Sequence, residues 1–600
     1  MTREAAEKAK EFVQQEKAFR LGELLTESSH PKTRTLSQTT QADLRAGLRQ
    51  LLSVDEDIVA ASERIFAQDS YPKLIAALLE AMRTGHQIFF TGCGATGRLS
   101  ILLEAAWRRF WGEHVGWGLP HQDQEEELAG QVPPDGLEDL CISVMAGGDF
   151  ALIKSVEGFE DFPDFGRYQL RQAGVQAGDV VVAITEGGET PFVIGSAWQG
   201  LEAGATVFFV YNNPTDLLRR HVKRSREVID EPRIHKLDLT TGPMAIAGST
   251  RMQATTVELL VVGAALETAL AQFVGWGLPH QFDRAPGDRP GLPYPTTFAK
   301  LIEALSADES VEALARLTQF EEDIYRRHGL VTYAADAVLL DVLTDTTERS
   351  PTFMVPPFRQ DGDTRSPVSW AFVKNPYHET REAWREMLQR PPRGLDWEPA
   401  VYEKLNAPET LRAEPPRLDN DRIHRFRIGN EIDPSRTDVP ETALVTIDIG
   451  GNSELQKAAT ETFGAGFGKT AAITIGPAAN TAVAGQHFHF PCELPASPLR
   501  LWEHLAVKLI LNTISTATMV RLERVIGNAM VWVSPSNKKL IDRGTRLIVQ
   551  QTGCSYERAC EVLFESMEAV SRDAQQGREP PSPVALAIQR ISHRNKETTA

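Results

Sequence analysis

Short apolar runs alternate with longer segments of mixed polarity through the first half of the chain. Four such runs, at 86–92, 141–148, 179–185 and 206–213, each end in Gly, Thr or Asn. Strands buried on both faces read as continuous apolar runs, and the intervening segments can hold crossover helices. The pattern predicts an α/β unit with a parallel sheet, whose functional residues gather at the carboxyl ends of the strands.

A second series of strand-like runs lies in the second half of the chain, at 330–335, 443–450, 470–476 and 487–491. The segment 354–441, which interrupts this series, is rich in Pro, Arg and Asp. We interpret it as an insertion of low regularity, either functional or a surface extension. The second series predicts another α/β unit.

Apolar residues at helical spacing predict helices within 1–85, at 254–273, at 297–327 and over most of the last 100 residues. The segment 503–525 is nearly continuous in apolar and small residues, which predicts a core helix. These changes of pattern divide the chain into an N-terminal helical segment (1–60), a first α/β domain (61–290), a second α/β domain (297–500) and a C-terminal helical region (501–600).

Composition narrows the class of protein. Hydrophobic residues make up 42% and charged residues 24% of the 600 residues, as in globular proteins. The net charge of −18 disfavours a nucleic-acid binder. No signal peptide and no uncharged apolar run of membrane-spanning length is evident, and five cysteines suit a reducing compartment. We therefore expect a cytoplasmic protein that binds neither nucleic acid nor membranes.

A glycine-rich turn, TGCGATGRL at 91–99, directly follows the first apolar run. Gly92, Gly94 and Gly97 would let the backbone approach a ligand closely, and Thr96 would add a hydroxyl group. The helix that follows would present its positive N-terminus, which suits a phosphate. The alternative is a tight turn without a ligand.

Other turns could complete a phosphate site. Thr185, Gly188 and Thr190 follow the third apolar run, Ser249 precedes the helix expected at 254–273, and Lys539 lies near the C-terminal region. Each alone is compatible with an ordinary turn, a helix cap or a solvated lysine. Together they predict that hydroxyl and N–H groups surround one phosphate, with Lys539 balancing its charge.

Two further groups of residues are of types that can carry chemistry. Glu157 is expected on a helix after the second apolar run, as a general acid or base or as a solvated surface charge. His487, His489 and Cys492 lack further partners at metal-binding spacing, so we predict no metal site.

The octapeptide VGWGLPHQ occurs twice, at 115–122 and at 274–281. We interpret the copies as similar apolar loops in which Trp117 and Trp276 anchor a turn, and no function follows from them.

Taken together, the motifs resemble the sugar isomerase (SIS) domain family, and more closely the N-acetylmuramic acid 6-phosphate etherases and the glucokinase regulatory proteins. The resemblance covers 1–270 and 500–570 and is carried by LTESSHPKTRTLSQ, GCGATGRL, AGGDFALIKSVEGFED, TPFVIG, YNNP, GPMAIAGSTRM and the segment 508–555. The length favours the two-domain layout of the regulatory proteins over the etherases, which are half this size.

The resemblance implies two doubly wound parallel-sheet SIS domains, each an αβα sandwich, that pack as an internal pseudo-dimer. It implies a sugar phosphate as ligand, no cofactor, and a monomer or homodimer. TERSPTF at 347–353 is similar to the segment that carries the first catalytic glutamate of the etherases, so Glu348 and Glu157 would be the catalytic pair across the pseudo-dimer interface. AADAVLLD at 334–341 lacks the glycines of GCGATGRL, so one of two potential sites would be equipped.

The chain departs from the family pattern at several positions. Ala106 stands where the etherases have their first glutamate, and Glu104, two residues away, would point elsewhere on the helix. Met244 replaces an acidic residue, Gln253 a lysine and Gly187 a serine.

Three functions are compatible with this resemblance. The first is a carbon–oxygen lyase that cleaves the lactyl ether of an amino sugar 6-phosphate with two carboxyl groups as acid and base. The second is a sugar-phosphate sensor without catalysis that regulates a sugar kinase. The third, a sugar-phosphate isomerase, leaves the match at 531–555 unexplained.

Overall fold

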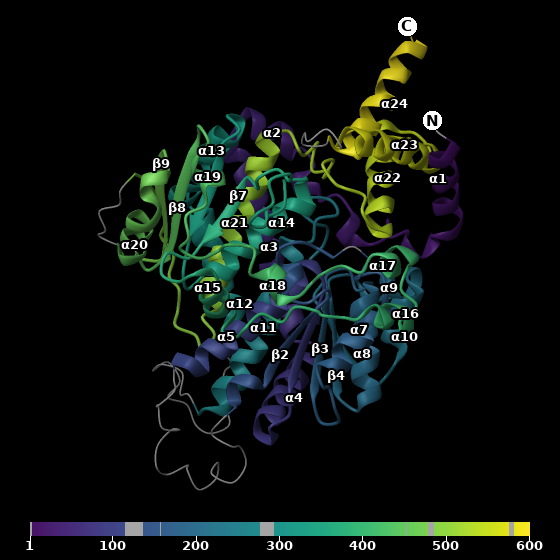
Figure 1. Ribbon diagram of the computed structural model, residues 1–600. Helices are drawn as coiled ribbons and strands as arrows, with labels where there is room; N and C mark the ends of the chain where they lie inside the picture. The colour runs from purple at the N-terminus through teal and green to yellow at the C-terminus, as the bar shows by residue number, and fades with distance from the viewer. Residues whose placement is uncertain are drawn as a thin grey trace.

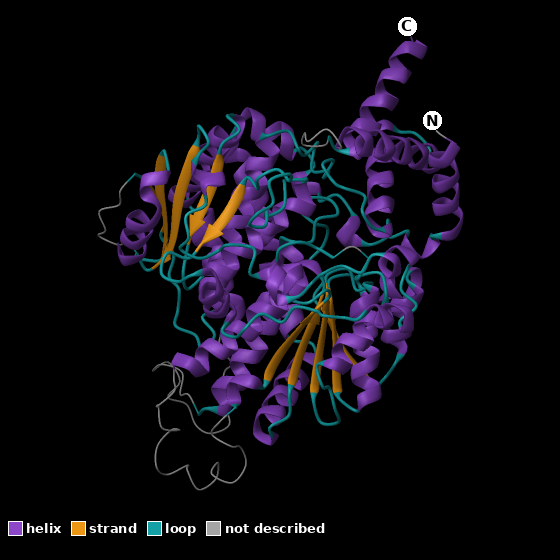
Figure 2. Cartoon of the chain, viewed as in Figure 1, coloured by secondary structure: helices purple, strands orange, loops and turns teal. Residues whose placement is uncertain are grey.

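Two five-stranded parallel sheets form the centre of the molecule, each flanked by helices (Figures 1 and 2). The computed structural model describes residues 3–113, 136–156, 158–275, 293–451, 453–477, 485–574 and 581–599. This architecture confirms the predicted fold class of two α/β units.

The first sheet has the strand order β2-β1-β3-β4-β5, and all its neighbouring strands are parallel. Its strands are β1 (Ile88–Gly92), β2 (Cys141–Met145), β3 (Val180–Thr185), β4 (Thr206–Tyr211) and β5 (Ile234–Asp238). Every residue of β1 and β3 is buried, because helices cover both faces. The strand order reverses between β1 and β3, and such a switch point is where ligands bind in open α/β sheets.

The helices around this sheet are α4 (Ser70–Thr84), α5 (Gly94–Glu113), α7 (Pro163–Gln172), α8 (Pro191–Ala203), α9 (Thr215–His221), α10 (Lys223–Asp230) and α11 (Gln253–Phe273). α7 and α8 pack closely through glycines. A Cβ atom on Gly166 would lie 1.9 Å from the carbonyl oxygen of Phe192, and one on Gly195 would lie 1.9 Å from that of Pro163. The two glycines therefore set the spacing of these helices.

The second sheet repeats the topology of the first. Its order, β10-β9-β8-β6-β7, is the same pattern counted from β6. Its strands are β6 (Leu330–Ala334), β7 (Ala371–Lys374), β8 (Thr442–Ile449), β9 (Lys469–Ile475) and β10 (Gln486–Phe490). Around it lie α12 (Tyr294–Ser306), α13 (Asp308–Arg326), α14 (Leu339–Phe353), α15 (Thr380–Leu388), α19 (Pro434–Thr437) and α20 (Ser453–Phe463). The short helices α16 (Pro399–Lys404), α17 (Glu409–Ala413) and α18 (Asn420–Ile423) lie instead against the first half, where Tyr402 of α16 is 6.3 Å from the ring of Phe165 in α7 (Figure 1).

The segment 354–441 is more regular than the sequence suggested. It contains the edge strand β7 and the short helices α15 to α19, so part of it belongs to the second sheet, while most of its residues lie outside helices and strands. The strand is four residues long and lies between proline-rich stretches, which hid it. The edge strand β5 of the first sheet was missed as well, because its sequence IHKLD is half polar. All eight strands that were expected do form.

The long helix α21 (Leu501–Arg521) joins the two halves. Most of its residues are buried, and it packs against α11 of the first half and against α13 and α14 of the second. The expected core helix and the packing of the halves against each other within one chain are therefore confirmed.

The remaining helices lie outside the sheets: α1 (Arg3–Gln15), α2 (Leu36–Ala42), α3 (Leu44–Phe66), α22 (Lys538–Thr552), α23 (Tyr556–Ala574) and α24 (Pro583–Thr599). α1 packs against α23, where the rings of Phe12 and Phe564 are 6.3 Å apart, so both termini lie at one corner of the molecule (Figure 1). α3 runs through the domain boundary that was placed at residue 60.

Among the described helices, α11 alone has the length and mean hydropathy of a membrane span. Its apolar window is 94% buried within the protein, as in the core helix of a globular domain.

Candidate functional site

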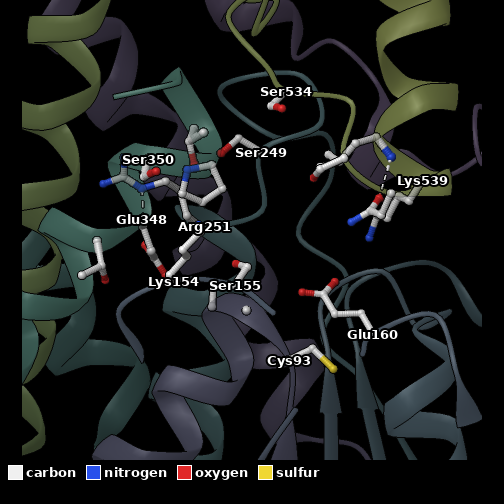
Figure 3. Close-up of a pocket in the computed structure, with 18 of the residues that line it drawn as sticks. Cys93, Lys154, Ser155, Glu160, Ser249, Arg251, Glu348, Ser350, Ser534 and Lys539 are labelled. Carbon is white, nitrogen blue, oxygen red and sulfur yellow. Dashed lines mark hydrogen bonds and ion pairs between the residues drawn. The ribbon is translucent and has the colours of Figure 1, made fainter. Parts of the chain in front are cut away.

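A cavity of about 430 Å³ lies at the carboxyl edge of the first sheet, between that sheet, α14 and the segment that leads into α22 (Figure 3). Its size is in the range of small-molecule sites, and its place is the switch point between β1 and β3. Five of the residues that the sequence singled out line it: Gly94, Thr190, Ser249, Glu348 and Lys539.

Of the three glycines in the glycine-rich turn, one lines the cavity and two pack within the protein. Gly94, in the left-handed conformation at φ +53°, lines the cavity and begins α5. A Cβ atom on Gly92 would lie 2.6 Å from the backbone of Thr96, and one on Gly97 would lie 2.5 Å from Met145. Gly92 and Gly97 therefore close the turn and pack it, and do not line the cavity as expected.

Thr96 also acts within the turn. Its hydroxyl donates to the carbonyl oxygen of Cys93 at 2.8 Å and accepts from the Cys93 N–H at 3.0 Å, and its side chain is buried away from the cavity. The Thr96 hydroxyl thus finds its partners in the backbone of the turn, and its contact with a phosphate stays a prediction.

In the turn after β3, likewise, some residues line the cavity and others make contacts within the protein. The hydroxyl groups of Thr185 and Thr190 are 3.0 Å apart, and only that of Thr190 belongs to a residue lining the cavity. Gly188, at φ +70°, supplies the carbonyl that accepts from Ser225 and does not line the cavity. Glu186 does line it, and burial raises the pKa of its carboxyl to about 7. Its position among small turn residues gave no signal in the sequence.

Lys539, at the start of α22, forms the cationic side of the cavity together with Arg543. Burial lowers the pKa of Lys539, but the Glu189 carboxylate, 2.7 Å from the ammonium group, raises it by more. The lysine pKa therefore lies above its usual value. One turn further along α22, Arg543 donates two hydrogen bonds to Glu27, at 3.0 and 2.6 Å. Glu27 comes from LTESSHP, so this N-terminal motif orients a cationic wall.

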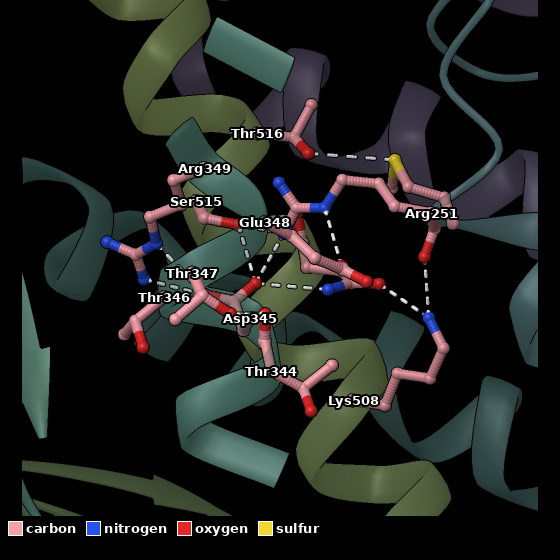
Figure 4. A network of polar contacts seen from close by, with 12 residues as sticks. Arg251, Thr344, Asp345, Thr346, Thr347, Glu348, Arg349, Lys508, Ser515 and Thr516 are labelled. Atoms are coloured by element: carbon pink, nitrogen blue, oxygen red, sulfur yellow. Dashed lines mark hydrogen bonds and ion pairs between the residues drawn. The ribbon is translucent and has the colours of Figure 1, made fainter. Parts of the chain in front are cut away.

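Glu348 reaches the cavity from α14 of the second half. Its side chain is buried, and burial raises its pKa against the opposing charges of Arg251 and Arg98. Oε2 of Glu348 lies 3.4 Å from Nε of Arg251 (Figure 4). A carboxyl group of the second half and the Gly94 turn of the first half therefore line one cavity, which makes the site composite.

Glu157 lies outside the described residues, while its neighbours Val156 and Gly158 line the cavity. None of the described residues 153–156 and 158–162, which follow the short 3₁₀ helix Asp149–Leu152, is helical. Glu160 and Asp161, which no sequence motif indicated, line the cavity, and burial raises the Asp161 pKa to about 6.

Position 106 and its neighbour 104 have structural roles. Ala106 is buried on α5. The Glu104 carboxylate is buried beside Arg390 at 3.0 Å, Arg393 at 2.8 Å and Arg108 at 2.9 Å. These arginines outweigh burial and hold the Glu104 pKa at about 2, so Glu104 is an ion-pair partner and does not line the cavity.

His487 and His489 share the hydroxyl of Thr474, at 2.8 and 2.9 Å. No group of three or more potential metal ligands occurs in the part of the chain that the structure describes. The VGWGLPHQ copies fall almost wholly outside that part.

Comparison with known proteins supports the resemblance. Residues 72–199 match the model of the glucokinase regulatory protein N-terminal SIS domain. The N-acetylmuramic acid 6-phosphate etherase of Actinobacillus pleuropneumoniae is 25% identical over 255 residues, which are 42% of this chain and 71% of that protein. The corresponding protein of Rippkaea orientalis is 31% identical over 240 residues, 39% of this chain and 64% of that protein.

Among solved structures, the C-terminal domain of glucosamine-fructose-6-phosphate aminotransferase from Francisella tularensis has a TM-score of 0.42 at 11% identity, over 78% of this chain and 94% of that chain. The resemblance of this chain to the SIS family, with the etherases and the regulatory protein as relatives, is confirmed by the family model and the etherase sequences.

Proposed function

We propose that this chain binds a sugar phosphate in the composite cavity and cleaves the C3 ether of an amino sugar 6-phosphate. The observation that carries the proposal is the position of Glu348, a buried carboxyl with a raised pKa that lines the same cavity as Gly94 and Lys539. Similarity to the etherases supports the choice of substrate.

In this proposal, Gly94, Thr190, Ser249 and Lys539 hold the phosphate with backbone N–H, hydroxyl and ammonium groups. The sugar ring then lies toward α14, beside Glu348. The resemblance also supports Glu157 as the second carboxyl, opposite Glu348. No cofactor is needed for this chemistry.

The reaction has two steps. After the ring opens, a carboxylate removes the proton from C2, the C3–O bond breaks, and the departing oxygen takes a proton from the other carboxyl group. Water then adds across the C2=C3 bond, its oxygen to C3 and a proton to C2. Glu348 suits the proton-donor role, because its raised pKa keeps the carboxyl protonated at higher pH than usual.

The test is incubation with N-acetylmuramic acid 6-phosphate and measurement of released lactate. Glu348→Gln and Glu157→Gln should each lower turnover by roughly 10²–10⁴. Glu303→Gln, on the exposed side of α12, is the matched control and should leave turnover unchanged. Lactate release that is insensitive to Glu348→Gln would exclude this mechanism.

The second candidate is a sensor that binds the sugar phosphate and regulates a sugar kinase without catalysis. The match of 72–199 to the regulatory-protein model favours it, as does Ala106 in place of the first-half glutamate. In this case the two glutamine variants would change ligand affinity, and no lactate would form. Either function fits a cytoplasmic location, where the five cysteines stay reduced.

A further inference from the structure

A second cavity, of about 370 Å³, lies at the carboxyl edge of the second sheet. It is enclosed by the end of α5, the turn after β6, the end of α15 and the residue before α21. α5 and α15 lie side by side there (Figure 1). Ligands of open α/β sheets bind outside the carboxyl ends of the strands, and this cavity shares no residue with the sugar-phosphate cavity.

Two arginines form the cationic part of the second cavity. Arg109 of α5 is partly buried, and its Nη1 donates to the carbonyl oxygen of Ala337 at 2.8 Å. It forms no ion pair with any residue that the structure describes. Arg500, whose side chain is 32% exposed, is already paired with Glu503 at 2.6 Å. Arg109 therefore presents a positive charge that lacks an anionic partner.

Carboxylates without a cationic partner line the same cavity. Glu113, Asp336 and Glu386 belong to no ion pair within the described parts of the chain. Asp336 is exposed, and its Oδ1 accepts from the side-chain amide of Asn375 at 2.9 Å. The oxygen of that amide accepts from two backbone N–H groups, at 2.8 and 3.2 Å, so the Asn375 N–H is held toward Asp336. The Asp336 carboxylate is thus positioned without being neutralised.

The two kinds of charge lie close together without pairing. Arg109 donates to Ala337, the residue after Asp336, yet no ion pair joins Arg109 to Asp336 in the described structure. Burial and the positive charge of Arg500 both lower the pKa of Arg109, so an anion close to it would be stabilising.

A ligand with a single kind of charge fits this cavity poorly. An anion such as phosphate would meet three carboxylates in addition to the arginines. A cation would leave the partly buried guanidinium of Arg109 without a partner. A compact zwitterion satisfies both, because each of its charged groups meets the opposite charge.

We propose that the second cavity binds an α-amino acid, whose carboxylate pairs with Arg109 and whose ammonium group pairs with Asp336. An α-amino acid carries both charges on one carbon atom, which matches an arginine that contacts the residue next to the aspartate. Both contacts are charge-assisted hydrogen bonds. Glu386 and Gln389 line the rest of the cavity and suit a polar side chain on the ligand. The inference goes beyond the proposed function and does not depend on it.

The first test is thermal unfolding of the full chain in the presence of each standard L-amino acid, added singly. A ligand that binds the folded state raises the melting temperature, so we expect at least one polar amino acid to do so. Calorimetry with that amino acid should give one site per chain, and inorganic phosphate should not displace it. If no amino acid raises the melting temperature, or if phosphate competes, the inference is overturned.

Analogues of the same amino acid test the two charges separately. Its amide, which lacks the carboxylate, and its deaminated acid, which lacks the ammonium group, should each bind roughly 10–100-fold more weakly, since each loses a hydrogen bond between charged groups. An analogue that binds as tightly as the amino acid would contradict the assigned pairing.

Variants place the amino acid in this cavity. Arg109→Met and Asp336→Asn should each weaken its binding by roughly 10–100-fold. Arg385→Met, on the exposed face of α15 and outside the cavity, is the matched control and should leave the affinity unchanged. Binding that withstands both changes would put the amino acid elsewhere and overturn the inference. If Arg109→Met does not fold, Asp336→Asn decides, because it alters an exposed side chain without changing its size.

Discussion

At the scale of single residues, the ammonium group of Lys539 pairs with Glu189, and its side chain lines the cavity. Lys539→Met should weaken the binding of a sugar phosphate by roughly 10–100-fold, because a hydrogen bond between charged groups is lost. The measurement is a calorimetric titration with N-acetylglucosamine 6-phosphate.

The neighbouring Lys538 provides the matched control. Its ammonium group is 2.8 Å from Glu16 and does not line the cavity. Lys538→Met should therefore leave the affinity unchanged, and equal losses in the two variants would contradict a specific phosphate contact.

Glu186 gives a second prediction at this scale. Its pKa is raised from about 4.5 to about 7 by burial, so the folded protein binds this proton more tightly than the unfolded chain does. The stabilisation is full below the unfolded pKa and is lost as the pH rises through about 7.

Glu186→Gln removes this ionisation. It should raise the free energy of unfolding at pH 8 by about 1–2 kcal/mol and have little effect at pH 4.5, a smaller gain than the full shift because the group faces the cavity. Urea unfolding at the two pH values measures it, with the exposed Glu23→Gln as control. A greater gain at pH 4.5 than at pH 8 would contradict the raised pKa.

At the scale of elements, an ion-pair cluster ties α5 and the turn after β2 to the segment after α15. Arg390 is buried between Glu104, at 3.0 Å, and Asp149, at 2.6 Å. Removal of one partner of a buried pair leaves the other charges uncompensated, so Arg390→Met should lower the free energy of unfolding by about 3–5 kcal/mol.

Chemical unfolding of the two proteins measures this loss. Arg385→Met, on the exposed face of α15, is the control and should cost less than about 0.5 kcal/mol. A loss of similar size in both variants would mean that the ion pairs of Arg390 stabilise the protein no more than an exposed arginine does.

The sequence predicted those elements whose pattern is local. Continuous apolar runs identified β1 and β3, because strands of a buried parallel sheet have no polar face. The edge strands β5 and β7 were missed, because one is half polar and the other is four residues long. Their pairing depends on a neighbouring strand that is distant in the sequence.

The same limit applies to the site. Gly94 and Lys539 could be selected from motifs, since a glycine turn and a basic residue carry a chemical signal. Whether a hydroxyl faces the cavity or the backbone depends on the tertiary arrangement, so the hydrogen bond of Thr96 to the Cys93 carbonyl oxygen could not be read from the sequence. Arg251 stands in a quoted motif, but its unpartnered Nη1 becomes visible only when α14 and α21 surround it.

At the scale of the whole molecule, the two sheets have the same strand order, yet different residues lie at their carboxyl edges. At the edge of the second sheet, the turn after β6 carries Asp336 and Ala337 where the first has Gly94. Arg109 of α5 reaches this edge and donates to the carbonyl oxygen of Ala337 at 2.8 Å. A backbone carbonyl and an aspartate repel a phosphate, and α5 carries Ala106 where α14 carries Glu348.

We therefore expect one sugar phosphate per chain. Calorimetry with N-acetylglucosamine 6-phosphate should give a single class of sites with a stoichiometry of about one, since only the first edge combines a glycine turn with a facing lysine. Arg109→Met, which alters only the second edge, should change neither the stoichiometry nor the affinity, whereas Lys539→Met should weaken the whole signal. Two equivalents of ligand, or a signal that depends on Arg109, would show that the duplicated fold has kept two working sites.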